Sequence, residues 1–221
     1  MSRKLVIFGL GDIGELAHFY FTEEGNYEIA AFAVDREYRK ADEFCGLPVV
    51  DFEEVQDRFP PSEYSLFVAL AYTEINQLRA RKVGEGKEKG YALASYVSDK
   101  ATVLTKEPIG ENCFILEDNT IQPFVRIGNN VTLWSGNHIG HHSVVEDHVF
   151  IASHVVVSGG VTVGEYSFIG VNTTLRDHIR IGKGNVLGAG SLIMADTEDD
   201  QLYTAPSAKL AKIPASRLPK I

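Results

Sequence analysis

Histidine is the residue type best suited to acid–base chemistry near neutral pH, and it can also bind a metal ion. Six of the seven histidines fall in one stretch: His138, His141, His142, His148, His154 and His178. His142, His148 and His154 are spaced by six residues, and the repeat described below places them on three different faces. They therefore cannot converge on a metal ion within one chain. We expect no metal site and expect most of these histidines to be polar turn residues on the outside.

His141 differs from the others because a glycine, Gly159, follows it by 18 residues. A coil of 18 residues would stack these two positions on one face, which gives the histidine open space and an approachable backbone N–H beside it. Acyl transfer needs a base that works near neutral pH. It also needs a hydrogen-bond donor for the carbonyl oxygen that gains negative charge. His141 and Gly159 are therefore the candidate catalytic residues.

A second motif, Gly9-x-Gly11-x-x-Gly14, follows a buried-strand pattern and opens a helix pattern. Asp35 ends the next strand pattern, 21 residues after Gly14. Glycines at this spacing let the backbone approach phosphates at a helix N-terminus, and an acidic residue at this distance can reach a ribose hydroxyl. The motif predicts a nucleotide site, and taken alone it also fits an NAD-dependent oxidoreductase.

An aliphatic residue recurs every six positions from Val97 to Ile193, in seventeen consecutive hexads. A strict period of six is typical of a parallel β-helix, in which three hexads close one triangular coil of about 18 residues. We therefore expect residues 96–198 to form a β-helix with its aliphatic residues inside. Repeats carry no chemistry by themselves, so a non-enzymatic scaffold is a further alternative.

Residues 1–95 alternate strand patterns with helical ones, which predicts βαβ units and a parallel sheet covered by helices. The expected strands cover 5–8, 27–34, 47–49, 65–70 and 92–97, and the expected helices cover 12–23, 52–58 and 73–88. This length is only half of a complete dinucleotide-binding fold. We expect a Rossmann-like half domain that ends near residue 95.

The formal net charge of −9 argues against nucleic acid as the main partner, because it would repel a phosphate backbone. The segment 199–221 is the exception, because it has no acidic residue from position 201 onward. Its basic residues are Lys209, Lys212, Arg217 and Lys220. This basic tail could meet the phosphates of a small polyanionic ligand.

The two cysteines, Cys45 and Cys113, are far apart and lack metal-ligand spacing, which fits a reducing compartment. No apolar run reaches the length of a membrane span. We therefore expect a cytoplasmic protein that does not enter a membrane.

The two halves together resemble a known family. A βαβ half opening with Val6-Ile7-Phe8-Gly9-Leu10-Gly11, followed by hexads carrying Asn137-His138-Ile139-Gly140-His141-His142-Ser143, is similar to the bacterial sugar acetyltransferases of the PglD, NeuD and perosamine N-acetyltransferase type. The resemblance covers essentially the whole chain. It implies an α/β Rossmann-like half domain followed by a left-handed parallel β-helix, assembled as a homotrimer with the coenzyme between neighbouring prisms.

The activity that the resemblance implies is transfer of acetyl from acetyl-coenzyme A to the amino group of a nucleotide-linked amino sugar, for bacterial surface glycans such as lipopolysaccharide. A sugar O-acetyltransferase is the alternative within the family. His141 matches the family's general base, and Gly159 matches the glycine whose N–H holds the thioester carbonyl. The other implied contacts are Gly9, Gly11, Gly14 and Asp35 for the nucleotide and Lys209 and Lys212 for the coenzyme.

Two departures from the family pattern matter. Some members have a carboxylate directly after the histidine to orient it, and here that residue is His142, so Glu146, Asp147 or a neighbouring chain could serve instead. The coenzyme-binding segment, commonly Gly-x-Pro-Ala-Lys, reads Ala-Pro-Ser-Ala-Lys over 205–209, one serine longer.

Aromatic residues beside the hexads indicate a contact between subunits. We expect four of them on the outside of the prism, at Trp134, Phe150, Tyr166 and Phe168, where a second chain could cover them.

Overall fold

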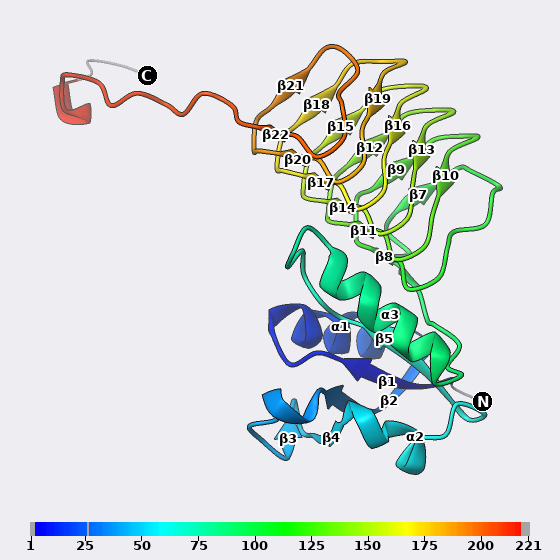
Figure 1. Cartoon of the computed structure of the whole chain (residues 1–221). Helices are drawn as coiled ribbons and strands as arrows, with labels where there is room; N and C mark the ends of the chain where they lie inside the picture. The colour runs from blue at the N-terminus through cyan, green and yellow to red at the C-terminus, as the bar shows by residue number, and fades with distance from the viewer. Residues whose placement is uncertain (1–2, 26, 218–221) are drawn as a thin grey trace.

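The computed structural model describes residues 3–25 and 27–217. Figure 1 shows a layered α/β part and, beyond it, a triangular β-helix from which the C-terminal segment extends as an arm. Within the described residues, no helix is long and apolar enough to cross a membrane.

The α/β part is a five-stranded sheet in the order β3-β4-β2-β1-β5. Its strands are β1 (Arg3–Phe8), β2 (Tyr27–Val34), β3 (Glu43–Phe44), β4 (Leu47–Asp51) and β5 (Tyr64–Val68). The helical elements are α1 (Asp12–Glu23), η1 (Arg36–Tyr38), η2 (Phe52–Glu54), α2 (Val55–Arg58) and α3 (Gln77–Glu88). The pairs β1–β2, β1–β5 and β2–β4 are parallel, and β3–β4 is antiparallel. The predicted parallel sheet is confirmed, whereas β3 was not predicted.

Both faces of this sheet are covered, because successive side chains of a strand point to opposite faces. Leu5 and Ile7 of β1 pack in the cluster that contains Phe21 of α1. Val6 and Phe8 pack in the opposite cluster, which contains Val83 of α3. The apolar run at the start of the chain is thus a strand buried on both faces.

One expected helix and one expected strand differ most from the structure. The helix expected at 73–88 begins at Gln77, because Glu74, Ile75 and Asn76 all have left-handed backbone angles, with φ of 53°, 51° and 65°. The strand expected at 92–97 is divided: Leu93 makes one parallel bridge to Leu66, whereas Tyr96 and Val97 begin the β-helix.

The β-helix consists of two-residue strands in three parallel sheets. The first sheet contains β10 (Arg126–Ile127), β13 (Val144–Val145), β16 (Thr162–Val163) and β19 (Arg180–Ile181). The second contains β6 (Tyr96–Val97), β8 (Phe114–Ile115), β11 (Thr132–Leu133), β14 (Phe150–Ile151), β17 (Phe168–Ile169), β20 (Val186–Leu187) and β22 (Leu202–Tyr203). The third contains β7 (Thr102–Val103), β9 (Thr120–Ile121), β12 (His138–Ile139), β15 (Val156–Val157), β18 (Thr174–Leu175) and β21 (Leu192–Ile193). A short 3-10 turn, η3 (Ala215–Arg217), lies in the arm.

The 18-residue coil is confirmed by the strand register, since Ile139 pairs with Val157 and Leu133 pairs with Ile151. The aliphatic residues from Ile115 to Ile193 form one buried cluster. The period of six therefore corresponds to one inward residue per prism side.

The histidines that recur every six residues lie at the corners of the prism, where the backbone conformation suits histidine. Residues three after the aliphatic lie in the left-handed region, with φ of 61° at His142, 65° at His148 and 59° at His154. Asn, Asp and His tolerate this region better than most residues. Three corners recur in each coil, so these three histidines lie on different corners, as expected.

Helix α3 fastens the α/β part to one corner of the β-helix, as its position between the two in Figure 1 indicates. Arg79 of α3 is only 1% exposed, and its guanidinium donates to Thr132 Oγ1 and to the backbone oxygens of Asn130 and His148, each at 3.2 Å. Asn76 donates through Nδ2 to the Tyr166 oxygen at 2.8 Å. The interface is therefore polar and fully enclosed at its centre.

The same interface overturns the expectation of exposed aromatic residues. Phe150 is only 3% exposed, and Tyr72 of the α/β part packs against Phe150 and Phe168 with ring centroids 5.2 and 4.6 Å apart. Trp134 and Tyr166 are partly buried. The chain covers these rings itself, because the segment before α3 folds back over the second sheet.

Candidate active site

His141 lies at the corner between β12 and β13, with its side chain exposed. Its backbone N–H donates to Gln122 Oε1 in the preceding coil at 2.9 Å. Gly159 lies beside it in the next coil, and a β-carbon added to Gly159 would stand 2.6 Å from His141 Cε1 and 2.7 Å from Nε2. The expected juxtaposition is confirmed, and only a glycine leaves the ring this room.

The N–H of Gly159 is unpaired among the described residues, and the sequence explains why. At two similar corners, the residue 19 positions earlier supplies the acceptor: Gln122 for His141 and Glu146 for Glu165. For Gly159 that residue is Gly140, which has no side chain. Since a β-carbon on Gly140 would lie 2.6 Å from Gly159 N, two glycines together leave this N–H open next to His141.

The neighbouring His142 contacts the His141 ring directly, with 3.1 Å between the two Nδ1 atoms. The carboxylates considered as orienting partners have other hydrogen bonds. Glu146 Oε2 accepts from the Glu165 N–H at 3.1 Å, and Asp147 Oδ1 accepts from the Asn129 N–H at 2.7 Å. Within the described chain, the hydrogen-bonding partner of His141 Nδ1 is therefore His142.

His148 departs from the expectation that these histidines are outward turn residues, because it is half-buried. Asn130 Nδ2 lies 3.0 Å from His148 Nδ1, and Asn112 Nδ2 donates to Asn130 Oδ1 at 3.0 Å. Asn112 Oδ1 in turn accepts from the Val68 N–H of β5 at 2.7 Å. Burial lowers the pKa of His148 and so favours the neutral imidazole. The hydrogen-bond chain fits this form, because Asn130 Nδ2 can donate to an unprotonated His148 Nδ1.

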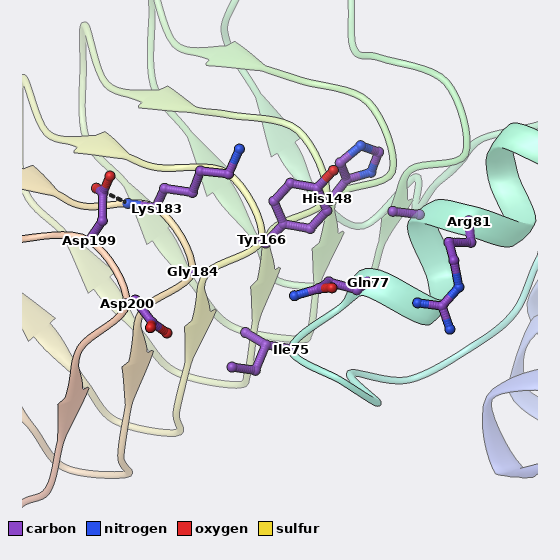
Figure 2. Close-up of a pocket in the computed structure, with 10 residues that line it drawn as sticks. Ile75, Gln77, Arg81, His148, Tyr166, Lys183, Gly184, Asp199 and Asp200 are labelled. Carbon is purple, nitrogen blue, oxygen red and sulfur yellow. Dashed lines mark hydrogen bonds between the residues drawn. The ribbon is translucent and has the colours of Figure 1, made fainter.

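A cavity of about 750 Å³ opens beside His148, between the start of α3 and the β-helix. Figure 2 shows Gln77 and Arg81 on the α3 side and Tyr166 and Lys183 on the β-helix side. Lys183 pairs with Glu165 and Arg81 pairs with Glu74, each at 2.8 Å. Because the basic groups have acidic partners, the cavity carries no marked excess of positive charge.

The glycine motif packs its backbone tightly at two positions and leaves the start of α1 open at the third. Gly9 has a φ of 122°, and a β-carbon there would lie 2.5 Å from the Ala69 oxygen. A β-carbon on Gly14 would collide with the Gly9 oxygen, so Gly14 brings α1 close to the strand. Gly11, at the N-cap of α1, has open space beside it. Gly9 and Asp35 line a cavity of about 590 Å³.

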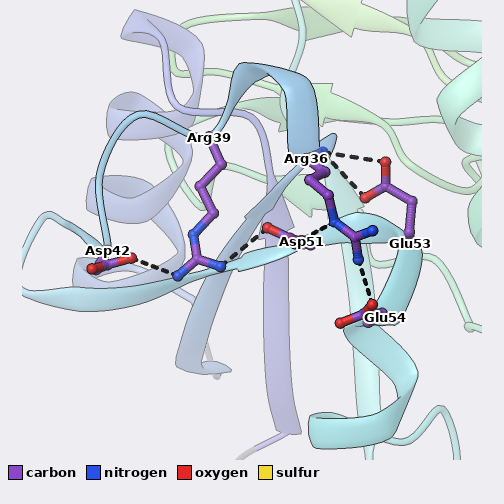
Figure 3. A network of polar contacts seen from close by, with 6 residues as sticks. All are labelled: Arg36, Arg39, Asp42, Asp51, Glu53 and Glu54. Atoms are coloured by element: carbon purple, nitrogen blue, oxygen red, sulfur yellow. Dashed lines mark hydrogen bonds and ion pairs between the residues drawn. The ribbon is translucent and has the colours of Figure 1, made fainter.

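Asp35 has a partner that the sequence did not reveal, since its Oδ1 accepts from Lys82 Nζ of α3 at 2.7 Å. The segment after Asp35 is fixed by the polar network in Figure 3. In this network Asp51 accepts from Arg36 at 2.8 Å and from Arg39 at 3.1 Å, and these bonds lower the pKa of Asp51. Asp35 therefore lies on the rim of the cavity, next to a segment that these ion pairs connect to Asp51.

The structure brings the expected residues together in separate groups. His141 and Gly159 form one group, and the glycine motif and Asp35 form another. The α/β part packs on the corner of His148 and Tyr166, whereas His141 lies on a different corner. Lys209 and Lys212 are exposed on the C-terminal arm, and Lys220 lies outside the described residues. No group of three or more metal-binding side chains occurs in the described ranges.

Comparison with known proteins supports this architecture. Residues 109–141, 125–159 and 142–177 match the family described as bacterial transferase hexapeptide (six repeats). No curated protein matches the sequence at a significant level.

Among solved structures, the acetyltransferase domain of PglB from Neisseria gonorrhoeae in complex with acetyl coenzyme A is 22% identical, with a TM-score of 0.81 over 91% of this chain and 96% of that one. PerB from Caulobacter crescentus, in complex with CoA and GDP-perosamine, is 23% identical, with a TM-score of 0.80 over 90% and 92%. WeeI from Acinetobacter baumannii is 17% identical, with a TM-score of 0.77 over 90% and 94%.

These likenesses span both parts of the chain. They confirm the expected fold class, a Rossmann-like half domain followed by a left-handed parallel β-helix. The resemblance to sugar acetyltransferases is likewise confirmed at the level of the fold.

Proposed function

We propose that this chain transfers acetyl from acetyl-coenzyme A to the amino group of a nucleotide-linked amino sugar, with His141 as general base. The observation that carries the proposal is the exposed His141 ring beside the unpaired N–H of Gly159. Structures of the same fold contain acetyl coenzyme A in PglB, and CoA with GDP-perosamine in PerB.

In the proposed reaction the sugar nitrogen attacks the thioester carbon while His141 Nε2 accepts a proton from that nitrogen. The carbonyl oxygen gains negative charge, and the Gly159 N–H donates a hydrogen bond to it. The C–S bond then breaks, and coenzyme A leaves as a thiolate that takes up a proton. The products are the acetamido sugar and free coenzyme A.

We propose direct attack rather than an acyl-enzyme intermediate, because neither cysteine suits nucleophilic catalysis. Burial raises the pKa of the Cys113 thiol to about 12, so it would hardly ionise near neutral pH. Cys45 as a whole is exposed, but its thiol is partly removed from water. This partial burial and the nearby Glu15 carboxylate both raise the pKa of the thiol. Cys45 also belongs to the α/β part, away from the His141 corner.

The nucleotide is proposed to occupy the cavity lined by Gly9 and Asp35, with its phosphates toward Gly11 and Gly14 at the start of α1, where a β-carbon on Gly11 would have open space. Since this cavity and His141 belong to different regions of one chain, we propose that a second copy brings its His141 to the cavity within a homotrimer. The arm would bring Lys209 and Lys212 to the phosphates of acetyl-coenzyme A. The product would serve the assembly of bacterial surface glycans such as lipopolysaccharide in the cytoplasm.

Two other functions remain alternatives. Sugar O-acetylation would use the same base and the same open N–H on a hydroxyl. An NAD-dependent oxidoreductase would use the glycine motif, but the Asp35 carboxylate already accepts from Lys82.

The test is thiol release from acetyl-coenzyme A with GDP-, UDP- and dTDP-linked 4-amino sugars, beginning with GDP-perosamine. We expect turnover with at least one of them, and His141→Ala should lower it by about 10²–10⁴, the usual contribution of a positioned base. Both substrates should still bind to the variant in calorimetry. Turnover within about threefold of the parent would exclude His141 as the base, and NADH binding with no response to any sugar nucleotide would favour the oxidoreductase.

A further inference from the structure

The His141–His142 pair has a feature beyond the base itself. The two rings are nearly perpendicular, at 85°, and their Nδ1 atoms lie 3.1 Å apart. This distance is that of a hydrogen bond, so one of the two nitrogens carries a proton and the other accepts it.

The coil before the pair holds the backbone of both histidines and the ring of His142. The His142 N–H donates to the Pro123 oxygen at 3.3 Å, and the His142 ring packs on Phe124 with centroids 4.7 Å apart. The His141 N–H donates to Gln122. Residues 122–124 thus accept hydrogen bonds from both backbone N–H groups and pack against the ring of His142.

The position of the shared proton decides whether His141 can act as a base. If His141 donates from Nδ1, its Nε2 keeps a lone pair and can accept a proton from a substrate. If His142 donates instead, neutral His141 carries its proton on Nε2, the atom beside Gly159. The two arrangements differ only in the tautomers of the rings.

We infer that His142 is a positioning residue that accepts the Nδ1–H of His141 and so keeps His141 Nε2 free to take the substrate proton. This inference rests on the proposed function. An imidazole can donate as well as accept, whereas a carboxylate can only accept. His142 therefore sets the tautomer of His141 less strictly than a carboxylate at the same position would.

Three variants separate this role from a merely structural one. His142→Phe keeps an aromatic ring for Phe124 but removes the acceptor, and His142→Glu supplies an acceptor that cannot donate when ionised. His154→Phe is the matched control, because His154 has the same left-handed corner conformation, φ 59°, on another corner.

We expect His142→Phe to lower kcat about 10- to 100-fold with KM for both substrates unchanged, as is usual when a hydrogen-bond partner of a functional histidine is removed. His142→Glu should restore kcat to within about threefold of the parent, and His154→Phe should leave it unchanged. Nitrogen-15 NMR of the imidazoles in the full-length protein should show His141 protonated on Nδ1 in the parent and in His142→Glu. The Nε2–H tautomer should appear in His142→Phe.

The inference is overturned if His142→Phe keeps kcat within about threefold of the parent. It is equally overturned if Phe and Glu variants lose activity alike while the His141 tautomer stays the same. Failure of the proposed function looks different, because His141→Ala itself would then retain turnover.

Discussion

At the scale of single residues, the candidate site depends on side chains that are small or missing. Gly159 leaves room for the His141 ring, and Gly140 leaves the Gly159 N–H without an acceptor. A spacing of 18 in the sequence is enough to pair His141 with Gly159. The offset of 19 that links Gln122 to His141 is also regular, and it could have identified Gly140 as the reason for the open N–H.

His148 provides a prediction about pH at the same scale. Its pKa is lowered in the folded chain, mainly by burial, with Arg79 and Lys183 in the same direction and Asp147 and Glu165 opposing. The unfolded chain therefore binds a proton more readily, starting near the ordinary pKa of about 6.5. Stability contributed by neutral His148 is present above that pH and is lost as the pH falls below it.

We expect the variant His148→Asn to lose less stability than the parent as the pH falls. Asparagine is chosen because it suits the left-handed corner conformation. Urea unfolding of parent and variant at pH 7.5 and pH 5.5 measures this difference, and the parent should lose more free energy of unfolding between the two values. Equal losses would mean that protonation of His148 is not coupled to folding.

At the scale of elements, α3 connects the two parts of the chain. Arg79 is buried and has no carboxylate partner among the described residues, and burial lowers its pKa to about 10. Its hydrogen bonds go to backbone oxygens and to Thr132. The guanidinium also lies 5.6 Å from the centroid of the Phe150 ring. One long side chain thus fills the centre of the interface and donates to several carbonyl groups.

Arg79→Ala should lower the free energy of unfolding by about 2–5 kcal/mol, the usual cost of removing a large buried side chain. Denaturant unfolding followed by circular dichroism measures it, with Arg58→Ala on the exposed end of α2 as the control. A loss no larger than that of the control would show that the interface does not depend on Arg79.

The C-terminal arm is a second element with a separable role. Strand β22 (Leu202–Tyr203) pairs with β20, and residues 204–217 beyond it are largely exposed. Deleting residues 204–221 should raise KM for acetyl-coenzyme A several-fold, because Lys209 and Lys212 are lost, while the melting temperature stays close to that of the parent. An unchanged KM would mean that the basic arm is only a solvated end.

At the scale of the whole molecule, the prediction concerns assembly. The aromatic rings expected to drive it are covered within the chain. A trimer is instead favoured by the separation of His141 from the glycine cavity and by exposed apolar side chains of the third sheet. Val156 and Leu192 of that sheet are 39% and 64% exposed. Light scattering should give about three times the chain mass of 24.3 kDa.

Complementation tests the shared site directly. His141→Asn and Gly11→Trp should each be inactive alone; a β-carbon at Gly11 would have no other atom within 4 Å. Coexpressed, they should regain activity, because mixed trimers contain sites with an intact His141 from one copy and an intact cavity from another. A monomer, or no recovery in mixed assemblies, would contradict the proposed arrangement.

The sequence alone determined the β-helix, its 18-residue coil and the pairing of His141 with Gly159, because a period of six allows only one inward residue per side. It also determined the strands and helices of the first half whose patterns are local. Tertiary structure decided what no local pattern encodes. Contacts between distant segments shortened α3 at Gln77, covered Phe150 with Tyr72, gave Asp35 a partner in Lys82 and buried His148. The orientation of His141 by His142 also depended on the folded corner, because only there do the two rings meet at Nδ1.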